Sequence, residues 1–203
     1  MVIIFILLAY LLGSIPSGIW IGKYFYQIDI REHGSGNSGS TNTFRVLGKK
    51  AGIIVLLIDI LKGTIPTLLA NFFIKTDINP LIIGLFAILG HTFSLFANFR
   101  GGKAVATSAG VILAIYPFFL LSGILLFLIL LYFSRMVSLS SMLTAFLLSL
   151  ASLFLQDTIF TIFCFSLTVF IIYRHRSNIE RIRQKTESKV PFGYKHKKKQ
   201  SKF

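Results

Sequence analysis

Charged residues are scarce in this sequence, acidic ones above all, and cysteine occurs once. Only 14% of the 203 residues are Asp, Glu, Lys or Arg, against roughly 25% in a typical soluble domain. Hydrophobic residues make up 54%, so we expect much of the surface to face lipid. With Cys164 alone an intrachain disulfide is excluded, and no Cys/His spacing typical of a metal site occurs. The composition therefore predicts an all-α integral membrane protein without a metal site.

Long apolar runs divide the chain into seven predicted transmembrane helices. They lie at about residues 2–24, 52–74, 79–98, 104–115, 117–133, 138–155 and 158–173. The run at 104–115 corresponds to roughly 18 Å of helix, whereas the hydrocarbon core is about 30 Å thick. We therefore expect a short, partial or re-entrant helix there. Residues 1–186 are predicted to form one membrane domain, and the basic tail 187–203 is expected to be disordered or bound to the membrane surface.

The basic residues predict how these helices are oriented. The net charge is +14, and seven spans place almost all Lys and Arg residues on one side. They lie in the connections 25–51, 99–103 and 134–137 and in the tail from Arg174. Cytoplasmic loops carry such an excess, so we expect the N-terminus outside and the C-terminus in the cytoplasm. A single helix over 104–133 would place Arg135 and the Lys-rich tail outside, against this bias.

The first connection contains a glycine-rich loop with polar residues between the glycines. It reads Arg31-Glu32-His33-Gly34-Ser35-Gly36-Asn37-Ser38-Gly39-Ser40-Thr41-Asn42. Glycine permits positive φ and lets backbone N–H groups turn toward an anion. Ser40 or Thr41 is expected to cap a short helix that carries Arg45, a residue suited to phosphate. The alternative is a flexible connector, but such linkers rarely contain Asn, Thr, His and Arg so densely.

A second polar cluster combines His91 with the segment Asn98 to Ser108, which contains Gly101-Gly102-Lys103. Two glycines and a lysine before a helix with hydroxyl groups in its first turn are typical of phosphate binding. The sequence is not a Walker A motif, because the first glycine and the four-residue spacer are missing. The alternative is a pair of basic residues that ends a span at the cytoplasmic border.

Asp59 and Lys62 lie near the middle of the second predicted span, three residues apart and therefore on one helix face. Ionisable groups at this depth are costly, and they usually pair and face the interior of a bundle. We expect a structural ion pair that supports the site from behind. Direct contact with a ligand is the alternative.

Two further polar segments lie at the predicted cytoplasmic ends of later spans. Ser134 to Ser141 offers Arg135 and several hydroxyl groups, although serines in membrane helices more often bond a backbone carbonyl. Arg174 to Glu180 contains a histidine and an asparagine, and by charge alone it is an ordinary stop segment. Basic groups outnumber acidic ones on this side, so the five clusters together indicate a site for an anionic, phosphorylated ligand.

Taken together, these residues resemble the bacterial acyl-phosphate:glycerol-3-phosphate acyltransferase family, the PlsY type. The resemblance covers residues 1 to about 186 in colinear order. The resemblance rests on these residues: Gly13-Ser14-Ile15-Pro16, Arg31 to Asn42 with Arg45, Asp59 with Lys62-Gly63, Gly90-His91 with Gly101 to Thr107, Val137 to Ser141, and His175 to Ile179. Ser40 departs from the family, which more often has Ala there, and the Lys-rich tail looks like an extension.

The resemblance implies an enzyme of phospholipid biosynthesis in a bacterial inner (plasma) membrane, with its active site on the cytoplasmic side. It would transfer a fatty acyl group from acyl phosphate to the sn-1 hydroxyl of glycerol 3-phosphate, giving lysophosphatidic acid and phosphate. No metal and no other cofactor is expected. Association with the enzymes that supply acyl phosphate or use the product is a further expectation, and no nucleic acid is expected to bind.

The resemblance also implies roles for individual residues. Acyl phosphate would be bound by Gly36, Gly39, Gly101, Gly102, Lys103, Ala104, Val105, Ala106 and Thr107. Glycerol 3-phosphate would be bound by Arg45, Lys103, Ser140, Ser141 and Asn178. The catalytic group would comprise Ser35, Asn37, Thr41, Asn42 and His175, supported by Asp59, Lys62, His91 and Arg135. The hydroxyl proton would pass to the donor's own phosphate or to one of three histidines, His33, His91 or His175, and the sequence leaves this choice open.

Two other function classes fit part of the pattern. A small transporter of a phosphorylated or anionic metabolite would also have short helices and ionisable groups at mid-membrane, but the sequence has no clear internal repeat and its polar clusters lie on one side. A lipid-binding scaffold anchored by the basic tail would lose its function when residues 190–203 are removed.

Overall fold

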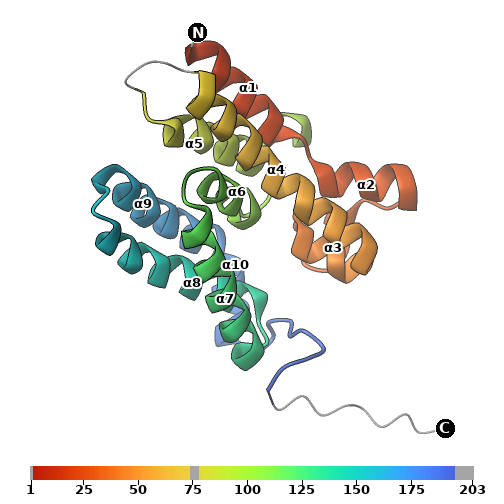
Figure 1. The fold of residues 1–203 in the computed structure, drawn as a ribbon. Coiled ribbons are helices and arrows are strands. Elements are labelled where there is room, and N and C mark those ends of the chain that lie inside the picture. The colour runs from red at the N-terminus through yellow and green to blue at the C-terminus, as the bar shows by residue number, and fades with distance from the viewer. Residues whose placement is uncertain (1, 74–77, 195–203) are drawn as a thin grey trace, which may run out of the picture. The chain divides into compact units, whose positions relative to one another are not determined.

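The computed structural model describes residues 2–73 and 78–194, and within these ranges the regular elements are helices, with no strand. Figure 1 shows their course along the chain. In chain order they are α1 (Val2–Ser14), α2 (Ser17–Tyr26), the 3-10 helix η1 (Ile30–Glu32), α3 (Ser40–Val46), α4 (Lys49–Phe73), α5 (Pro80–Thr92), η2 (Leu95–Ala97), α6 (Val105–Ile115), α7 (Pro117–Ser134), α8 (Val137–Ser152), η3 (Leu153–Leu155), α9 (Thr158–Arg174) and α10 (Arg176–Arg183). The predicted all-α class is confirmed for these residues.

Several helices are suited to cross a membrane. By length and composition, four described segments qualify: Lys49–Phe73, Pro80–Ala97, Pro117–Ser134 and Val137–Leu155. The number rises to six if each of two bent pairs is one span, α1 with α2 (42°) and α9 with α10 (59°). α6 has only 11 residues, which agrees with the short helix predicted at 104–115. The fold is thus that of a multi-pass helical membrane protein, whereas seven spans and their orientation stay predictions.

The predicted first span, residues 2–24, is broken at Ile15-Pro16. Proline has no backbone N–H and cannot continue the hydrogen-bond ladder of a helix. Pro16 instead precedes α2 as its N-cap residue, and its carbonyl accepts a hydrogen bond from the N–H of Trp20 at 2.9 Å. The break turns Ser17, which opens α2, into the interior, where it is buried.

The chain forms two compact units, residues 1–120 and 121–203. In the first unit, α4 and α6 approach each other closely because glycines face backbone. A Cβ atom at Gly63 of α4 would lie 2.1 Å from the carbonyl oxygen of Thr107, and one at Gly110 of α6 would lie 2.0 Å from that of Ile60. Helices in lipid associate through such small residues, since van der Waals contact replaces the hydrophobic effect.

The same packing joins α1 to α5. A Cβ atom at Gly13 would lie 2.1 Å from the carbonyl oxygen of Ala87, and one at Gly90 would lie 2.2 Å from that of Tyr10. Small and medium side chains fill the contact between these helices and α4: Ala9, Ala70, Ile83 and Ala87. The end of α5 is therefore fixed to the break between α1 and α2, where two polar loops also meet.

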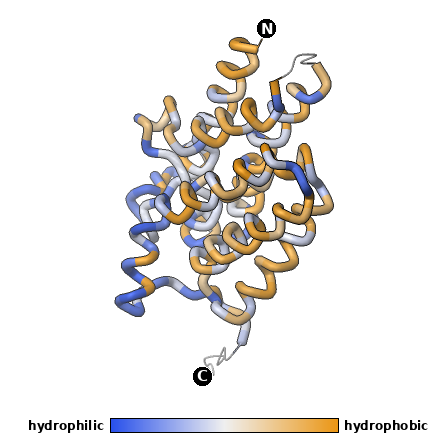
Figure 2. Tube along the Cα trace, turned by 90° about the vertical axis from the view of Figure 1, so that its left-hand side faces the viewer, coloured by the Kyte–Doolittle hydropathy of each residue, from blue (hydrophilic) through white to orange (hydrophobic). Residues whose placement is uncertain are grey.

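In the second unit, hydroxyl groups join α8 and α9. Thr168 donates a hydrogen bond to the carbonyl of Ala145 (2.9 Å), and Thr161 donates one to that of Ser152 (3.2 Å). Large apolar side chains stay exposed along the helices, among them Leu125 of α7 at 62%. Figure 2 shows the hydrophobic colour over much of the helical chain. Such exposure suits contact with lipid rather than water.

Candidate active site

The glycine-rich loop of the first unit is organised around the side chain of Asn42. This side chain is 1% exposed. Its Oδ1 accepts a hydrogen bond from the N–H of Ser35 (2.8 Å), and its Nδ2 donates to the carbonyls of Ile30 (2.8 Å) and His33 (3.1 Å). The amide therefore holds the loop in shape, and the predicted catalytic role of Asn42 stays a prediction.

The glycines of this loop serve different purposes. Gly36 has φ of +70°, as expected for a loop that needs the left-handed region. Gly39 has extended backbone and is the N-cap residue of α3, without a side-chain cap. The expected cap by Ser40 or Thr41 is wrong, because the helix already begins at Ser40. Asn37 instead accepts a hydrogen bond from the N–H of Gly39 at 2.9 Å.

The short helix itself is present as predicted. α3 carries Thr41, Asn42 and Arg45, with Arg45 in its last turn. The hydroxyl of Thr43 stabilises its start, because it donates a hydrogen bond to the carbonyl of Gly39 at 3.2 Å. Loop and helix thus form one ordered element on which Ser35, Asn37 and Arg45 have defined places.

The Gly-Gly-Lys segment is bound to the end of α5. The N–H of Gly101 donates to the carbonyl of Thr92 (3.0 Å), and the N–H of Gly102 donates to that of His91 (3.1 Å). A Cβ atom added at Gly101 would lie 1.9 Å from the carbonyl oxygen of His91. One added at Gly102 would lie 2.1 Å from Nε2 of the same histidine. Both positions thus need glycine for contact with α5, and their two N–H groups bond backbone oxygens instead of facing a ligand. The predicted contact of Gly101 and Gly102 with acyl phosphate stays a prediction, and in this structure their N–H groups are already bonded to α5.

The segment then enters α6 through a strained residue. Ala104 is the N-cap residue with φ of +67°, a region that non-glycine residues seldom adopt. Behind it, the hydroxyls of Thr107 and Ser108 are buried and have no hydrogen-bond partner among the described residues. Buried polar atoms are nearly always paired. These two hydroxyls are therefore the buried polar groups of the segment that lack a hydrogen-bond partner within the described residues. The sequence predicted hydroxyl donors in this first turn but named only Thr107 as a binding residue.

A buried polar network lies between the two loops. The Nζ of Lys62 is 2.6 Å from Oδ1 of Asp59, and the same oxygen accepts a hydrogen bond from Ser17 at 2.7 Å. The Nδ1 of His91 lies 3.7 Å from it. Asp59 and Lys62 are 1% and 5% exposed, so they form the predicted ion pair. Ser17 was not predicted. Pro16 signals a break in the helix, but the sequence does not say toward which side the following residue turns.

This network brings the two loops together. A small cavity is lined by Ile15, Pro16, Ser17, Ser38, Asp59, Lys62, His91, Ser94 and Gly101. Ser38 belongs to the glycine-rich loop and Gly101 to the Gly-Gly-Lys segment, while Asp59 and Lys62 come from α4. Three of the five predicted clusters therefore meet in the first unit.

The second unit contains a different polar cluster, centred on Glu187. Its Oε1 accepts hydrogen bonds from Ser138 (2.6 Å) and Asn178 (2.7 Å), and its Oε2 accepts one from Arg181 (2.8 Å). Burial raises the pKa of Glu187, but these three hydrogen bonds outweigh it and the net pKa is lowered. Glu187 was missed, although it is the last acidic residue in a strongly basic stretch.

The predicted serines of α8 are bonded locally. Ser140 donates to the carbonyl of Met136 (3.0 Å), and Ser141 donates to that of Val137 (2.8 Å). These are the i−4 bonds that serines in membrane helices commonly make. Each oxygen can still accept a hydrogen bond, so the expected contact with glycerol 3-phosphate stays a prediction.

His175 and Arg135 also have defined contacts. The Nδ1 of His175 lies 2.8 Å from the carbonyl oxygen of Ile171. Since a carbonyl only accepts, the proton is on Nδ1, and in the neutral ring Nε2 is the acceptor. Arg135 has φ of +60° and donates to the carbonyls of Val190 and Phe192, both at 3.0 Å. Arg135 thus binds the segment after α10.

Comparison with known proteins places this geometry in a family. The sequence matches the family model described as glycerol-3-phosphate acyltransferase over residues 3–185. The glycerol-3-phosphate acyltransferase of Enterococcus faecalis is 54% identical over 207 residues (97% of this chain, 95% of the relative), and that of Bacillus subtilis is 54% identical over 190 residues (94% and 98%).

Two crystal structures have the same fold. They are of PlsY (YgiH), an integral membrane glycerol 3-phosphate acyltransferase, in the glycerol 3-phosphate form (39% identity, TM-score 0.84) and in the lysophosphatidic acid form (38%, 0.82). Each likeness covers 93% of this chain and 94% of the other. Because the family model matches nearly the whole chain and the curated relatives exceed half identity, this chain belongs to the glycerol-3-phosphate acyltransferase family.

Proposed function

We propose that this chain transfers a fatty acyl group from acyl phosphate to the sn-1 hydroxyl of glycerol 3-phosphate, with lysophosphatidic acid and phosphate as products. The observation that carries the proposal is its likeness, at a TM-score of 0.84 and 39% identity, to a structure in a glycerol 3-phosphate form, and at 0.82 to one in a lysophosphatidic acid form. These two molecules are the acceptor and the product of the proposed reaction.

Acyl phosphate as donor agrees with the chemistry of the described residues. The sequence has no Gly-x-Ser-x-Gly nucleophile elbow, so the substrate is expected to carry its own activated group. The hydroxyl oxygen attacks the carbonyl carbon, and the bond between this carbon and the phosphate oxygen breaks. The proton passes to the leaving phosphate, whose second pKa of about 6 suits neutral pH, or to a histidine such as His175 through Nε2.

The roles of the binding groups follow from charge and position. Arg45 and Lys103 offer cations for phosphate, and Thr107 and Ser108 offer buried hydroxyls without a described protein partner. Asp59 lies 3.7 Å from Nδ1 of His91 at the end of α5, and the carbonyl of His91 accepts a hydrogen bond from the N–H of Gly102. Positioning of two bound substrates then supplies much of the rate.

The membrane topology and the side on which the active site lies are part of the same proposal. Seven spans, an outside N-terminus and a cytoplasmic C-terminus would place the polar loops at the inner leaflet of a bacterial inner membrane. The positive charge of the connections supports this orientation.

A phosphate-release assay on purified protein in detergent tests the proposal. We expect phosphate release from palmitoyl phosphate only when glycerol 3-phosphate is present, with lysophosphatidic acid formed in equal amount. Acyl-coenzyme A and acyl carrier protein thioesters serve as matched donors and should give no product. A transporter would show no turnover in detergent, because transport needs a sealed compartment, and product from a thioester would reject the proposed donor.

A further inference from the structure

A groove of about 500 Å³ opens on the first unit beside α2, where the glycine-rich loop and the Asn98 to Ser108 segment begin. Its lining comes from α2, η1 and η2: Ile19, Trp20, Lys23, Tyr24, Gln27, Arg31, Phe96, Ala97 and Asn98. None of these residues has a role in the proposed binding of acyl phosphate or glycerol 3-phosphate. The groove therefore needs an explanation of its own.

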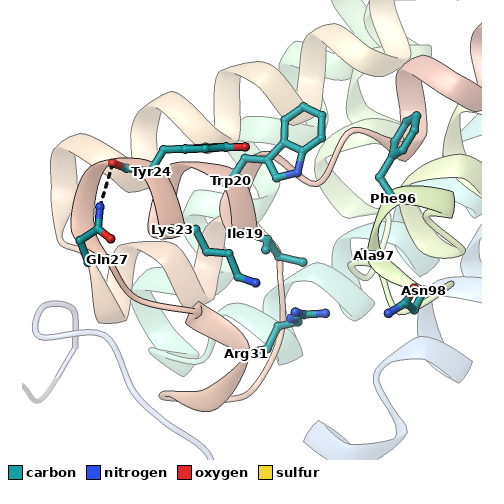
Figure 3. A pocket seen from close by; sticks show the side chains of 9 residues that line it. All are labelled: Ile19, Trp20, Lys23, Tyr24, Gln27, Arg31, Phe96, Ala97 and Asn98. Carbon is teal, nitrogen blue, oxygen red and sulfur yellow. Dashed lines mark hydrogen bonds between the residues drawn. The ribbon is translucent and has the colours of Figure 1, made fainter.

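One side of the groove is cationic and well ordered. Figure 3 shows the ends of Lys23, Arg31 and Asn98 gathered at its lower part. Asp29 fixes the two cations, since its carboxylate lies 2.6 Å from Nη2 of Arg31 and 3.3 Å from Nζ of Lys23. The hydrogen bonds from Arg31 hold the pKa of Asp29 well below its usual range, so this carboxyl group is ionised at neutral pH.

The charged residues that line the groove are both cations, Lys23 and Arg31. The carboxylates of Asp29 and Glu32 next to Arg31 offset part of this charge, but donors of the lining stay unused. Arg31 uses Nε and Nη2 toward Asp29, so its Nη1 points elsewhere, and Asn98 adds an amide. Lys23 is half exposed at 53% of its side chain. A single monoanion such as a phosphodiester suits two lining cations whose charge is already partly offset.

The other side of the groove is aromatic. The rings of Trp20 and Phe96 lie 6.1 Å apart, and the two residues are 40% and 51% exposed. Tyr24 beside them is 75% exposed. Trp and Tyr gather where the headgroups of a bilayer meet its hydrocarbon. A ligand that fits both sides thus has an anionic head and an apolar body.

We propose that this groove binds one anionic phospholipid of the surrounding membrane, with its phosphodiester between Lys23, Arg31 and Asn98 and an acyl chain against Trp20 and Phe96. Inorganic phosphate shares the head chemistry but would leave the aromatic side uncovered. A zwitterionic phospholipid shares the apolar body but has no net charge to match the groove.

The sole tryptophan of the chain, Trp20, reports on this groove directly. We place the full-length protein in phosphatidylcholine nanodiscs and titrate phosphatidylglycerol with brominated acyl chains, which quench a nearby indole; brominated phosphatidylcholine is the matched lipid. One net charge near a membrane surface is worth about 1 kcal/mol, so half-maximal quenching is expected at about fivefold lower mole fraction of the anionic lipid. The readout needs no substrate, so it is independent of the proposed catalysis.

Variants decide whether the groove causes the preference. Lys23→Gln should remove the difference between the two lipids, whereas Lys23→Arg should keep it. Lys50→Gln, which removes an exposed cation of α4 outside the groove, should also keep it. Equal quenching by both lipids in the unaltered protein, or a preference that survives Lys23→Gln, would overturn the proposal. Loss of the preference in excess inorganic phosphate would also overturn it, in favour of a free-anion site.

Discussion

Buried polar side chains of this protein fall into two groups according to their partners. Asn42 uses both ends of its amide to hold the glycine-rich loop, and Asp59 accepts bonds from Lys62 and Ser17. Thr107 differs, because its hydroxyl is buried and has no hydrogen-bond partner in the described part of the chain. An unpaired buried hydroxyl costs stability, so a ligand that pairs it gains an interaction that the empty protein lacks.

The variant Thr107→Val tests whether a ligand pairs the buried hydroxyl of Thr107. Valine has the same shape and lacks the unpaired hydroxyl, so the variant is expected to keep or raise the apparent Tm of the native protein. If Thr107 bonds the donor phosphate, kcat/KM should fall roughly 10- to 100-fold, the range expected for a hydrogen bond to a charged group. Steady-state phosphate release and thermal unfolding in detergent measure the two effects.

Thr64→Val is the matched control for this variant. The hydroxyl of Thr64 donates to the carbonyls of Gly110 (3.0 Å) and Ile60 (3.2 Å). Its removal should lower the free energy of unfolding by about 1 kcal/mol and leave kcat/KM close to normal. Unchanged activity in Thr107→Val would remove Thr107 from the proposed donor site.

At the scale of elements, the segment after α10 folds back on the turn between α7 and α8. The N–H of Val190 donates to the carbonyl of Arg135, and the N–H of Tyr194 donates to that of Tyr132, both at 2.8 Å. Glu187 adds bonds from α8 and α10. Residues 187–194, which the sequence placed in a basic tail, are therefore held against the second unit, while residues 195–203 lie outside the described part.

Glu187→Gln should destabilise this element. The side chain of Glu187 is 6% exposed, and its two oxygens accept three hydrogen bonds. Glutamine has one acceptor oxygen and an NH2 group that faces donors, so the expected loss is about 1–3 kcal/mol of unfolding free energy. Circular dichroism of the detergent-solubilised protein measures the fall in apparent Tm.

The pH dependence of this loss has a defined sign. The pKa of Glu187 is lower in the folded protein than its ordinary value of 4.5. Its contribution is therefore complete above pH 4.5 and is lost as the pH falls through the folded-state pKa. The difference in apparent Tm between the native protein and Glu187→Gln should therefore decrease as the pH is lowered through this pKa. A difference that increases at lower pH would contradict the lowered pKa.

The glycines next to helices have different neighbours in the structure from those that the sequence predicted. Gly101 and Gly102 were expected to bring N–H groups to a phosphate, but both lie against α5, and their N–H groups bond Thr92 and His91. Gly63 and Gly110 lie at helix contacts that no pattern in the sequence revealed. Glycine permits close approach, but the sequence does not say whether a ligand or another helix approaches.

At the scale of the whole molecule, the two units divide the predicted clusters. The glycine-rich loop, the Asp59–Lys62 pair and the Gly-Gly-Lys segment belong to the first unit, and the α8 serines with His175 and Asn178 belong to the second. The basic tail, residues 187–203, is absent from every proposed substrate contact.

Removal of residues 195–203 tests the tail as a whole. This deletion takes away five lysines without touching Glu187 or the segment 187–194. We expect near-full phosphate release and an unchanged apparent Tm, whereas deletion from residue 187 should lower both. Loss of function in the shorter deletion would favour the scaffold alternative, in which the tail is the anchor.

The sequence by itself determined the membrane class, the helical fold, the polar loops and the family, because apolar run lengths and local motifs depend on neighbours along the chain. Only the tertiary structure decided which side chains meet: Ser17 turns inward at a proline break, Glu187 returns to Ser138, and Trp20 lies beside Phe96. Contacts between residues distant in sequence depend on helix packing and chain direction, and a local pattern does not encode them.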